Sequence, residues 1–125
     1  MSTYAEIIGR VDSYKPSAFE TEEKLRWLTE LDGKIAVEVM MLNPEFVRNM
    51  PRGEVALSCE PLIGFPYEDL YDRWLEAKID YHNGEFSAYQ NAMEAYNAAY
   101  NGWLNWFLNS YDPVQGYERM DEYGT

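Results

Sequence analysis

Residues 86–107 read FSAYQNAMEAYNAAYNGWLNWF, and this stretch decides the fold that the sequence predicts. Its large apolar residues recur at intervals of three or four, which places them on one side of an α-helix. This set, which we call the aromatic stripe, consists of Phe86, Tyr89, Met93, Tyr96, Tyr100, Trp103 and Phe107. Such a stripe predicts a long core helix in an all-α antiparallel bundle. A base-stacking platform and a carbohydrate-binding row are the alternatives.

Two other faces of this helix carry smaller and more polar side chains. An alanine seam runs beside the aromatic stripe and comprises Ala88, Ala92, Ala95 and Ala99, with Trp106 continuing on that side. We therefore expect the helix to lie centrally, wedged between two neighbours. The third face, which we call the amide face, comprises Asn91, Asn97, Asn101, Asn105 and Asn109. Exposed helix faces usually favour Glu and Lys, so the amide face is either a solvated back or a subunit interface.

Local signals place two helices near the start of the chain. Thr3 and Glu6 form a capping box, which predicts a short helix through Val11. Thr21 is expected to be the N-cap of a second helix, whose apolar stripe continues to Leu42. With the aromatic helix and one more described next, we expect a bundle of three main helices and a short N-terminal one.

The remaining main helix is expected to begin at Pro66 and to end at the turn formed by Asn83 and Gly84. This turn predicts an antiparallel hairpin with the aromatic helix; a single helix running through Gly84 is the alternative. One face carries an acidic residue at every fourth position, and this acidic stripe comprises Glu68, Asp72, Glu76 and Asp80. Like charges at this spacing repel each other. The acidic stripe is therefore either a solvated face or a functional one, namely a wall that repels DNA or a dock for basic residues.

A long Pro-rich connection joins the second helix to the third, because four prolines lie between residues 44 and 66. Residues 54–59 are expected to form a short strand within it. Leu62, Ile63 and Phe65 are expected to lie as a hydrophobic flap against the bundle. Connections longer than about 15 residues are unusual in compact domains and often carry function. This connection is therefore our first candidate for contact with a partner.

The composition indicates one acidic domain. We expect residues 1–112 of the 125 to form a single helical domain and residues 113–125 to form a flexible C-terminal tail. The formal net charge of −12 argues against binding to phosphate backbones, which takes clustered Lys and Arg. Cys59 is the only cysteine, and no apolar run approaches the roughly 20 residues of a membrane span. We expect a soluble chain, made inside the cell, that binds neither membranes nor specific nucleic-acid sequences.

The sequence carries no recognisable catalytic pattern. His82 is the only histidine, so no site that needs two imidazoles can be built. Asp80 and His82 are two residues apart on a helix and point to different sides, which makes them poor metal ligands together with Glu85. The eight glycines are dispersed and form neither a phosphate loop nor a dinucleotide fingerprint. We predict a protein that is not an enzyme and that holds no cofactor or metal.

Four stretches together resemble a known class of phage proteins. They read LRWLTELDGKI at residues 25–35, FPYEDLY at 65–71, IDYHNGE at 79–85 and YQNAM at 89–93, with the Pro-rich connection between the first two. This layout, from about residue 5 to residue 108, resembles the small helical head–tail connector (adaptor) proteins that prophages of long-tailed bacteriophages encode. The resemblance lies in the overall pattern and includes no catalytic motif.

The resemblance implies a virion structural protein that forms a homo-oligomeric ring between the portal and the tail-side proteins, without a cofactor. Such a protein is found in the bacterial cytoplasm during assembly and then in the virion. In a ring of this kind the acidic stripe would line the lumen or face a partner. The subunit interface would use Asn97, Asn101, Asn105, Asn109, Leu62, Ile63 and Phe65. The alternatives are an acidic DNA-mimic inhibitor or interaction module of phage origin, and a ligand binder with a polar cavity.

Overall fold

The computed structural model describes residues 2–110 and is all-α, which confirms the predicted fold class. Within these residues there are six helices and no strand. The helices are α1 (Tyr4–Tyr14), α2 (Thr21–Glu38), α3 (Pro44–Arg48), the 3-10 helix η1 (Gly53–Ser58), α4 (Asp69–His82) and α5 (Phe86–Ser110). The predicted tail, residues 113–125, lies outside the described residues. No helix in the described range combines the length and the apolar character needed to cross a membrane.

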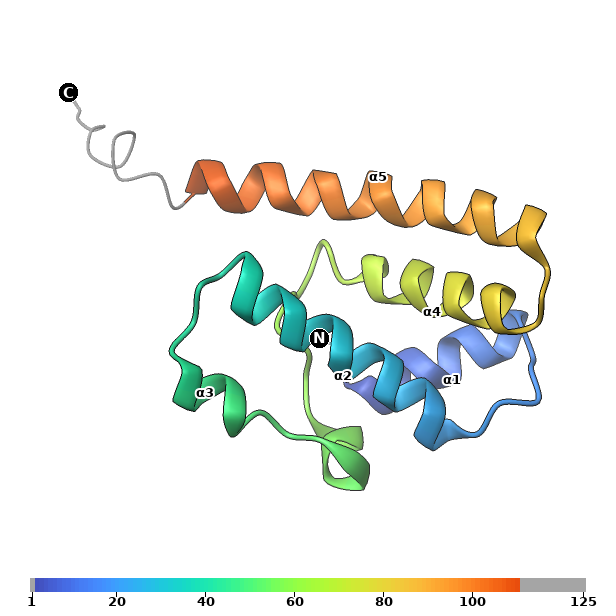
Figure 1. The fold of residues 1–125 in the computed structure, drawn as a ribbon, viewed down its shortest axis with the longest axis horizontal. Helices are drawn as coiled ribbons and strands as arrows, with labels where there is room; N and C mark the ends of the chain where they lie inside the picture. Colours follow the sequence, from blue (N-terminus) through green and yellow to red (C-terminus); the bar gives the residue numbers. More distant parts are fainter. Residues whose placement is uncertain (1, 111–125) are drawn as a thin grey trace.

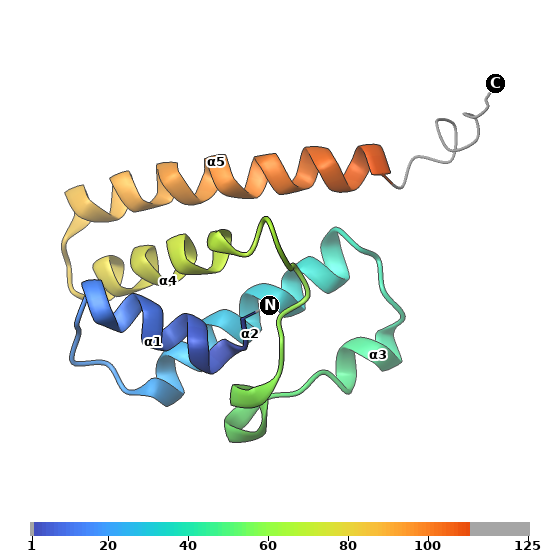
Figure 2. The ribbon, with the colours of Figure 1, turned by 180° about the vertical axis from the view of Figure 1, so that it is seen from behind.

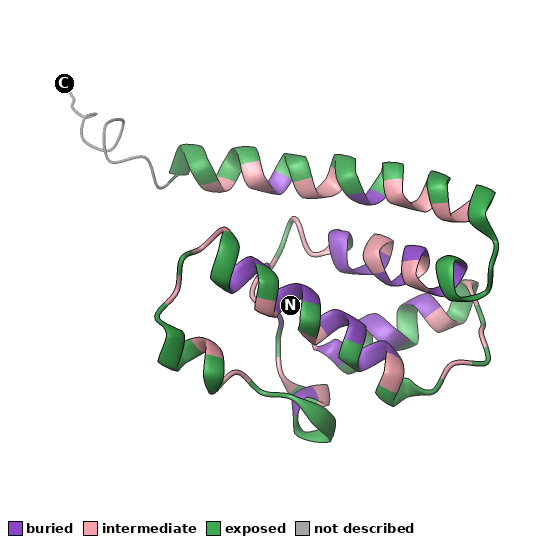
Figure 3. Cartoon of the chain, in the orientation of Figure 1, coloured by how far each residue is buried: buried purple, intermediate pink, exposed green. Residues whose placement is uncertain are grey.

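The core lies between α1, α2 and α4, with η1 closing one side. α4 is placed between α5 on one side and the α1 and α2 pair on the other (Figure 1), and Figure 2 shows the same order from behind. The most deeply buried large side chains come from these three helices: Ile7, Val11, Leu28, Leu70, Tyr71, Leu75 and Ile79. The buried residues accordingly concentrate on α1, α2 and α4 in Figure 3. α1 is thus a full member of the core and not a minor addition to three main helices.

The prediction that α5 is the central helix is wrong. α5 packs along α4, and of the aromatic stripe only Tyr96 and Trp103 are buried, while Phe86 is 60% exposed. Ala95 and Trp106 are exposed as well, so within residues 2–110 no second helix packs against the alanine seam. The spacing of apolar residues measures the width of an apolar face but not the number of neighbours that cover it. α5 is therefore an outer helix that is covered on one side.

The aromatic stripe nevertheless makes the contact that it predicts, because it faces α4. The ring centroids of Trp74 on α4 and Tyr96 on α5 lie 5.0 Å apart. Further along α5, Trp103 stacks on Phe107 at 5.1 Å. A base-stacking platform and a carbohydrate-binding row both need an open stripe, so this contact argues against both alternatives.

Two helix ends show the predicted capping chemistry, and two predicted starts are wrong. Thr21 is the first residue of α2 and not its N-cap, and α4 begins at Asp69 and not at Pro66. The capping box is present, with Thr3 Oγ1 accepting from the Glu6 N–H at 3.2 Å and Glu6 Oε1 accepting from the Thr3 N–H at 2.9 Å. Between α4 and α5, Asn83 is the C-cap of α4 and Gly84 has a φ of 75°. Such a φ is easily adopted only by glycine, so the helix stops there and the chain reverses into α5. The antiparallel hairpin is confirmed.

The connection after α2 differs from the prediction in two ways. α2 ends at Glu38 and not at Leu42, because Asn43 caps a new helix: its Oδ1 accepts from the Glu45 N–H at 2.7 Å. The short strand expected at residues 54–59 is wrong, since this stretch forms η1. A strand needs a neighbouring strand to satisfy its backbone groups, and within the described residues none exists. A 3-10 turn satisfies these groups locally and buries Ala56.

Candidate functional site

The acidic stripe of α4 faces α1 and is paired within the chain. Asp72 accepts two hydrogen bonds from the Arg10 guanidinium, from Nε and Nη2, each at 2.7 Å. About two turns further along α4, Lys15 Nζ lies 3.0 Å from Asp80 Oδ1. Asp72 and Asp80 are only 7% and 2% exposed. Both carboxylates are therefore buried ion-pair partners that join α4 to α1.

The other two carboxylates of the stripe have partners from the same segment. Glu76 accepts a hydrogen bond from the Tyr14 hydroxyl at 2.6 Å, and Glu68 accepts one from the Ser2 N–H at 3.1 Å. Hydrogen bonding from Ser2 holds the pKa of Glu68 below its usual value. Burial, together with the hydrogen bond to Glu76, raises the pKa of Tyr14. Each pairing spans more than sixty residues of sequence.

Asp72 and Asp80 are buried, so these two members of the acidic stripe are not available to line a lumen or to face a partner. The stripe is covered by α1, so its charges are compensated inside the chain. An acidic residue at every fourth position gives the same sequence pattern whether that face of the helix contacts solvent or basic residues from a distant part of the chain. Sequence reasoning missed the pairing because Arg10 and Lys15 are remote in sequence from the residues that they contact.

Asp32 is a fully buried carboxylate that the sequence analysis did not single out. It lies on α2 and accepts hydrogen bonds from three groups: the Tyr4 hydroxyl, the Tyr71 hydroxyl at 2.6 Å and the Leu62 N–H at 3.1 Å. The Tyr71 hydroxyl in turn accepts from the Ile63 N–H at 2.9 Å. This network ties α1, α2 and α4 to the segment that follows η1. Asp32 interrupts the apolar stripe of α2 between Leu28 and Ile35, which was the available sequence signal.

Burial dominates the electrostatics of this network. Loss of solvent raises the pKa of Asp32 above its usual value, although the hydrogen bonds from Tyr4, Tyr71 and Leu62 act in the opposite direction. Burial and the neighbouring Asp32 raise the pKa values of Tyr4 and Tyr71. All three donors bond to Asp32, so the role of the network is to hold α1, α2, α4 and the segment after η1 together.

The amide face points outward along α5. Asn91, Asn97, Asn101, Asn105 and Asn109 are all exposed. Glu94 is the only charged residue among the 25 residues of this helix, in a chain whose formal net charge is −12. Trp106 and Leu108 are about half exposed near the end of α5. This surface is therefore long, nearly uncharged and not covered by any described part of the chain.

The other three residues expected at the subunit interface differ in how far they are exposed. Ile63 is buried and is not available as a surface residue, which corrects that expectation, whereas Leu62 is partly buried and Phe65 is 81% exposed. Phe65 and Trp106 both line an apolar pocket of about 280 Å³ near the end of α5. The ring of Tyr67 lies 5.7 Å from that of Trp106 in the same place. The hydrophobic flap thus lies partly in the core and partly beside α5.

His82 ends α4 and takes part in an aromatic contact. Its ring stacks on Trp27 with centroids 4.9 Å apart and planes 4° from parallel. Asp80 is directed to Lys15, the C-cap residue of α1, and not to His82. In the described part of the chain, no group of three or more His, Cys, Asp or Glu side chains is arranged to hold a metal ion.

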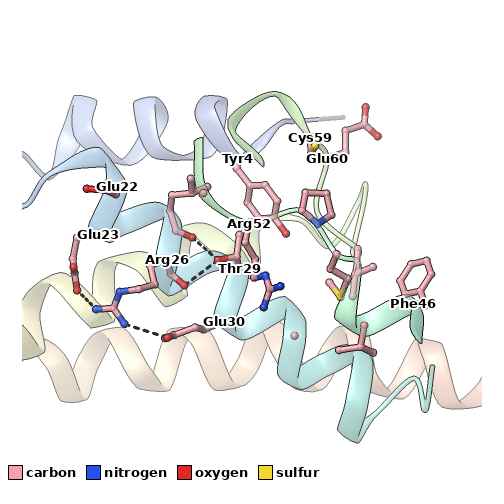
Figure 4. Close-up of a pocket in the computed structure, with 17 residues that line it drawn as sticks. Tyr4, Glu22, Glu23, Arg26, Thr29, Glu30, Phe46, Arg52, Cys59 and Glu60 are labelled. Carbon is pink, nitrogen blue, oxygen red and sulfur yellow. Dashed lines mark hydrogen bonds and ion pairs between the residues drawn. The ribbon is translucent and has the colours of Figure 1, made fainter. Parts of the chain in front are cut away.

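A groove of about 810 Å³ separates α2 from the segment that holds α3 and η1 (Figure 4). Its lining combines apolar side chains with several charged ones, and Figure 4 shows Arg26 bridging Glu23 and Glu30 along α2. The groove therefore has an apolar base and a polar rim, which is the usual character of a binding site. The sequence analysis pointed to this connection as a contact segment but had no means of finding the groove.

Comparisons with protein-family models, curated proteins and solved structures find no match to this chain. The fold and the surfaces described above therefore define an all-α protein with one long uncharged helix face. The resemblance to head–tail connector proteins stays a prediction.

Proposed function

We propose that this protein is a phage or prophage virion structural protein, a head–tail connector subunit that forms a ring between the portal and the tail. The observation that carries the proposal is the outward face of α5, which is exposed and nearly free of charge over a helix of 25 residues. The resemblance of the sequence layout to connector proteins suggests the particular class. In this proposal the ring contacts are made by α5.

Charge is the first argument for self-association through α5. Two copies of a chain with a net charge of −12 repel each other on most surfaces. Protein interfaces are depleted of charged residues in their centres, and the outward face of α5 carries only Glu94. α5 is therefore the helix along which a second copy can approach with the least electrostatic cost.

The chemistry of the amide face supports the same contact. An asparagine side chain both donates and accepts hydrogen bonds, so a row of them can pair with many polar surfaces without a charge. Ala95, Ala98 and Gly102 lie between the asparagines and are also exposed, which lets another chain come close to the helix. A closed ring requires a heterologous contact, so this face would meet a different surface of the next copy.

The DNA-mimic alternative finds less support. A mimic must present carboxylates to a basic enzyme in place of phosphates, whereas the regularly spaced carboxylates of α4 are taken up by Arg10, Lys15 and Tyr14. The connector proposal does not need these carboxylates on the surface. We therefore retain it as the single proposed function.

Sedimentation velocity over a range of protein concentrations tests the proposal. We expect oligomers of the wild-type chain and their loss in the Asn101→Glu/Asn105→Glu variant, which places two like charges on the contact. The matched control is Ala5→Glu/Ala18→Glu, which adds the same charge at exposed positions away from α5 and should leave the oligomers intact. A wild-type chain that stays monomeric up to about 1 mM would limit association to about −4 kcal/mol and contradict the proposal.

A further inference from the structure

The groove between α2 and the α3–η1 segment has an apolar base that is open to solvent. Tyr4, Leu25 and Leu62 line it from the core side. Phe46, Val47, Met50 and Pro51 line it from α3 and the residues that follow. α3 has no buried residue, and Phe46 is 52% exposed. The apolar side of this short helix is thus presented to the groove and not packed into the core.

The charged rim of the groove is acidic in balance. Four carboxylates and two guanidinium groups line it, which leaves a formal charge of −2 from four negative and two positive groups: Glu22, Glu23, Glu30 and Glu60 against Arg26 and Arg52. Arg26 is engaged by Glu23 and Glu30, and Arg52 donates to the Arg48 carbonyl at 3.4 Å. Within the described residues, Glu22 and Glu60 form no ion pair or hydrogen bond through their carboxylates. These two are the negative charges that an occupant would meet.

We propose that this groove binds a segment of another protein in which basic residues flank apolar ones. The apolar side chains would cover Leu25, Phe46 and Met50, and the basic side chains would pair with Glu22 and Glu60. Charge complementarity selects this occupant over a second copy of the chain, which has 22 acidic and 10 basic residues. The site is separate from α5, so this proposal and the ring proposal succeed or fail independently.

Fluorescence anisotropy with a labelled peptide of repeated Lys-Leu-Leu-Lys units tests the charge and apolar requirements. A peptide of repeated Glu-Leu-Leu-Glu units of the same length is the control ligand. We expect the basic peptide to bind the wild-type chain and the acidic peptide not to bind. Absence of binding by the basic peptide overturns the proposal, and so does equal binding of both peptides.

Two pairs of charge reversals distinguish peptide binding in the groove from non-specific electrostatic attraction to an acidic protein. Glu22→Lys/Glu60→Lys changes the rim, whereas Glu38→Lys/Glu85→Lys changes two exposed residues that do not line the groove. We expect the rim pair to weaken binding at least about tenfold, a free-energy change of about 1.4 kcal/mol, and the control pair to weaken it less than about twofold. Equal losses would assign the binding to net charge alone and overturn the proposal.

A side chain that fills the groove gives a test that does not depend on charge. Gly33 lines the groove on α2, and a Cβ added there meets no heavy atom within 4 Å, so Gly33→Leu is expected to fold and to block the site. Gly9→Leu on α1 is the matched control, because it also has open space and lies outside the groove. Circular dichroism and thermal unfolding verify that both variants are folded. Unchanged peptide binding by Gly33→Leu overturns the proposal.

The remaining outcome concerns a second copy of the chain. If the rim reversals change the sedimentation of the protein but leave peptide binding unchanged, a neighbouring copy occupies the groove and the proposal is wrong. The Asn101→Glu/Asn105→Glu variant should bind the basic peptide with wild-type affinity, because α5 does not line the groove. This arm distinguishes failure of the groove proposal from failure of the ring proposal.

Discussion

Replacing Asp32 by alanine should destabilise the fold strongly, because Asp32 is the common acceptor of three buried donors. The variant leaves the Tyr4 hydroxyl, the Tyr71 hydroxyl and the Leu62 N–H without their acceptor. The Tyr71 oxygen still accepts from the Ile63 N–H, but its own O–H group no longer donates to Asp32. A buried donor without a partner costs about 1–3 kcal/mol, so three such donors cost about 3–9 kcal/mol. Removing a buried charge offsets part of this cost. We expect a net loss of about 2–4 kcal/mol in the free energy of unfolding.

Urea unfolding at pH 7, followed by circular dichroism, measures this loss. With a denaturant dependence of about 1–3 kcal/mol/M, a loss of about 2–4 kcal/mol should lower the midpoint by roughly 0.7–4 M. Lys34→Ala is the control on the same helix; it changes an exposed residue and should stay within about 0.5 kcal/mol of the wild type.

A double-mutant cycle with Tyr4→Phe isolates the network itself. Without its hydroxyl, residue 4 no longer leaves an orphaned donor when Asp32 is removed, so Asp32→Ala should cost about 1–3 kcal/mol less in the Tyr4→Phe background. Strictly additive effects, or a loss of less than about 1 kcal/mol for Asp32→Ala alone, would refute the reasoning.

Three further predictions follow from named contacts. Arg10→Ala should lower the free energy of unfolding by about 1–3 kcal/mol in urea, because Asp72 loses two hydrogen bonds of 2.7 Å. The control Arg26→Ala removes an exposed side chain and should have no measurable effect. Equal losses in the two variants would contradict the assignment of Asp72 as a buried partner. Gly84→Ala should lower the stability of the fold by about 1–2 kcal/mol, because residue 84 has a φ of 75°, whereas Gly33→Ala inside α2 should raise it by about 0.5–1 kcal/mol. Thermal unfolding that shifts in the same direction for both variants would be inconsistent with the helix boundaries. Carbon-13 NMR should give the Asp32 carboxyl a pKa above its usual 3.8. This pKa should rise further in Tyr71→Phe, because the substitution removes a hydrogen bond to the charged carboxylate. A lower pKa in Tyr71→Phe would contradict this role of the Tyr71 hydroxyl.

The raised pKa of Asp32 also has a defined sign in the dependence of stability on pH. A carboxyl whose pKa is higher in the folded chain than in the unfolded chain binds more protons when folded. Its contribution to stability is therefore largest below pH 3.8 and declines as the pH rises through the folded pKa. Glu68 acts in the opposite direction, because its pKa is lowered and its contribution is lost as the pH falls.

Some features that depend on neighbouring residues in the sequence could be predicted, whereas the starts of α2 and α4 could not. The capping box at Thr3 and Glu6 and the reversal at Asn83 and Gly84 are set by backbone groups within a few residues, and both are present as expected. The boundary of α2 was placed too late because Val39 to Leu42 continue its apolar pattern, while the chain in fact leaves the helix to begin again at the Asn43 cap.

Features that depend on distant residues could not be predicted in the same way. The partners of the α4 carboxylates are Arg10 and Lys15, which lie more than sixty residues earlier in the sequence. The position of α5 depends on the fact that α1 and α2 already cover the other side of α4. The groove lies between α2 and the segment that holds α3 and η1, which replace the expected loop and strand. No local sequence pattern predicts the distance between this segment and α2.

Native mass spectrometry of the intact chain beside Asn101→Glu/Asn105→Glu tests the central claim most directly, namely that the outward face of α5 is the contact between subunits. The account predicts a closed oligomer of one defined copy number for the wild-type chain and monomers for the variant. Wild-type monomers alone, or an oligomer that survives both substitutions unchanged, would contradict it.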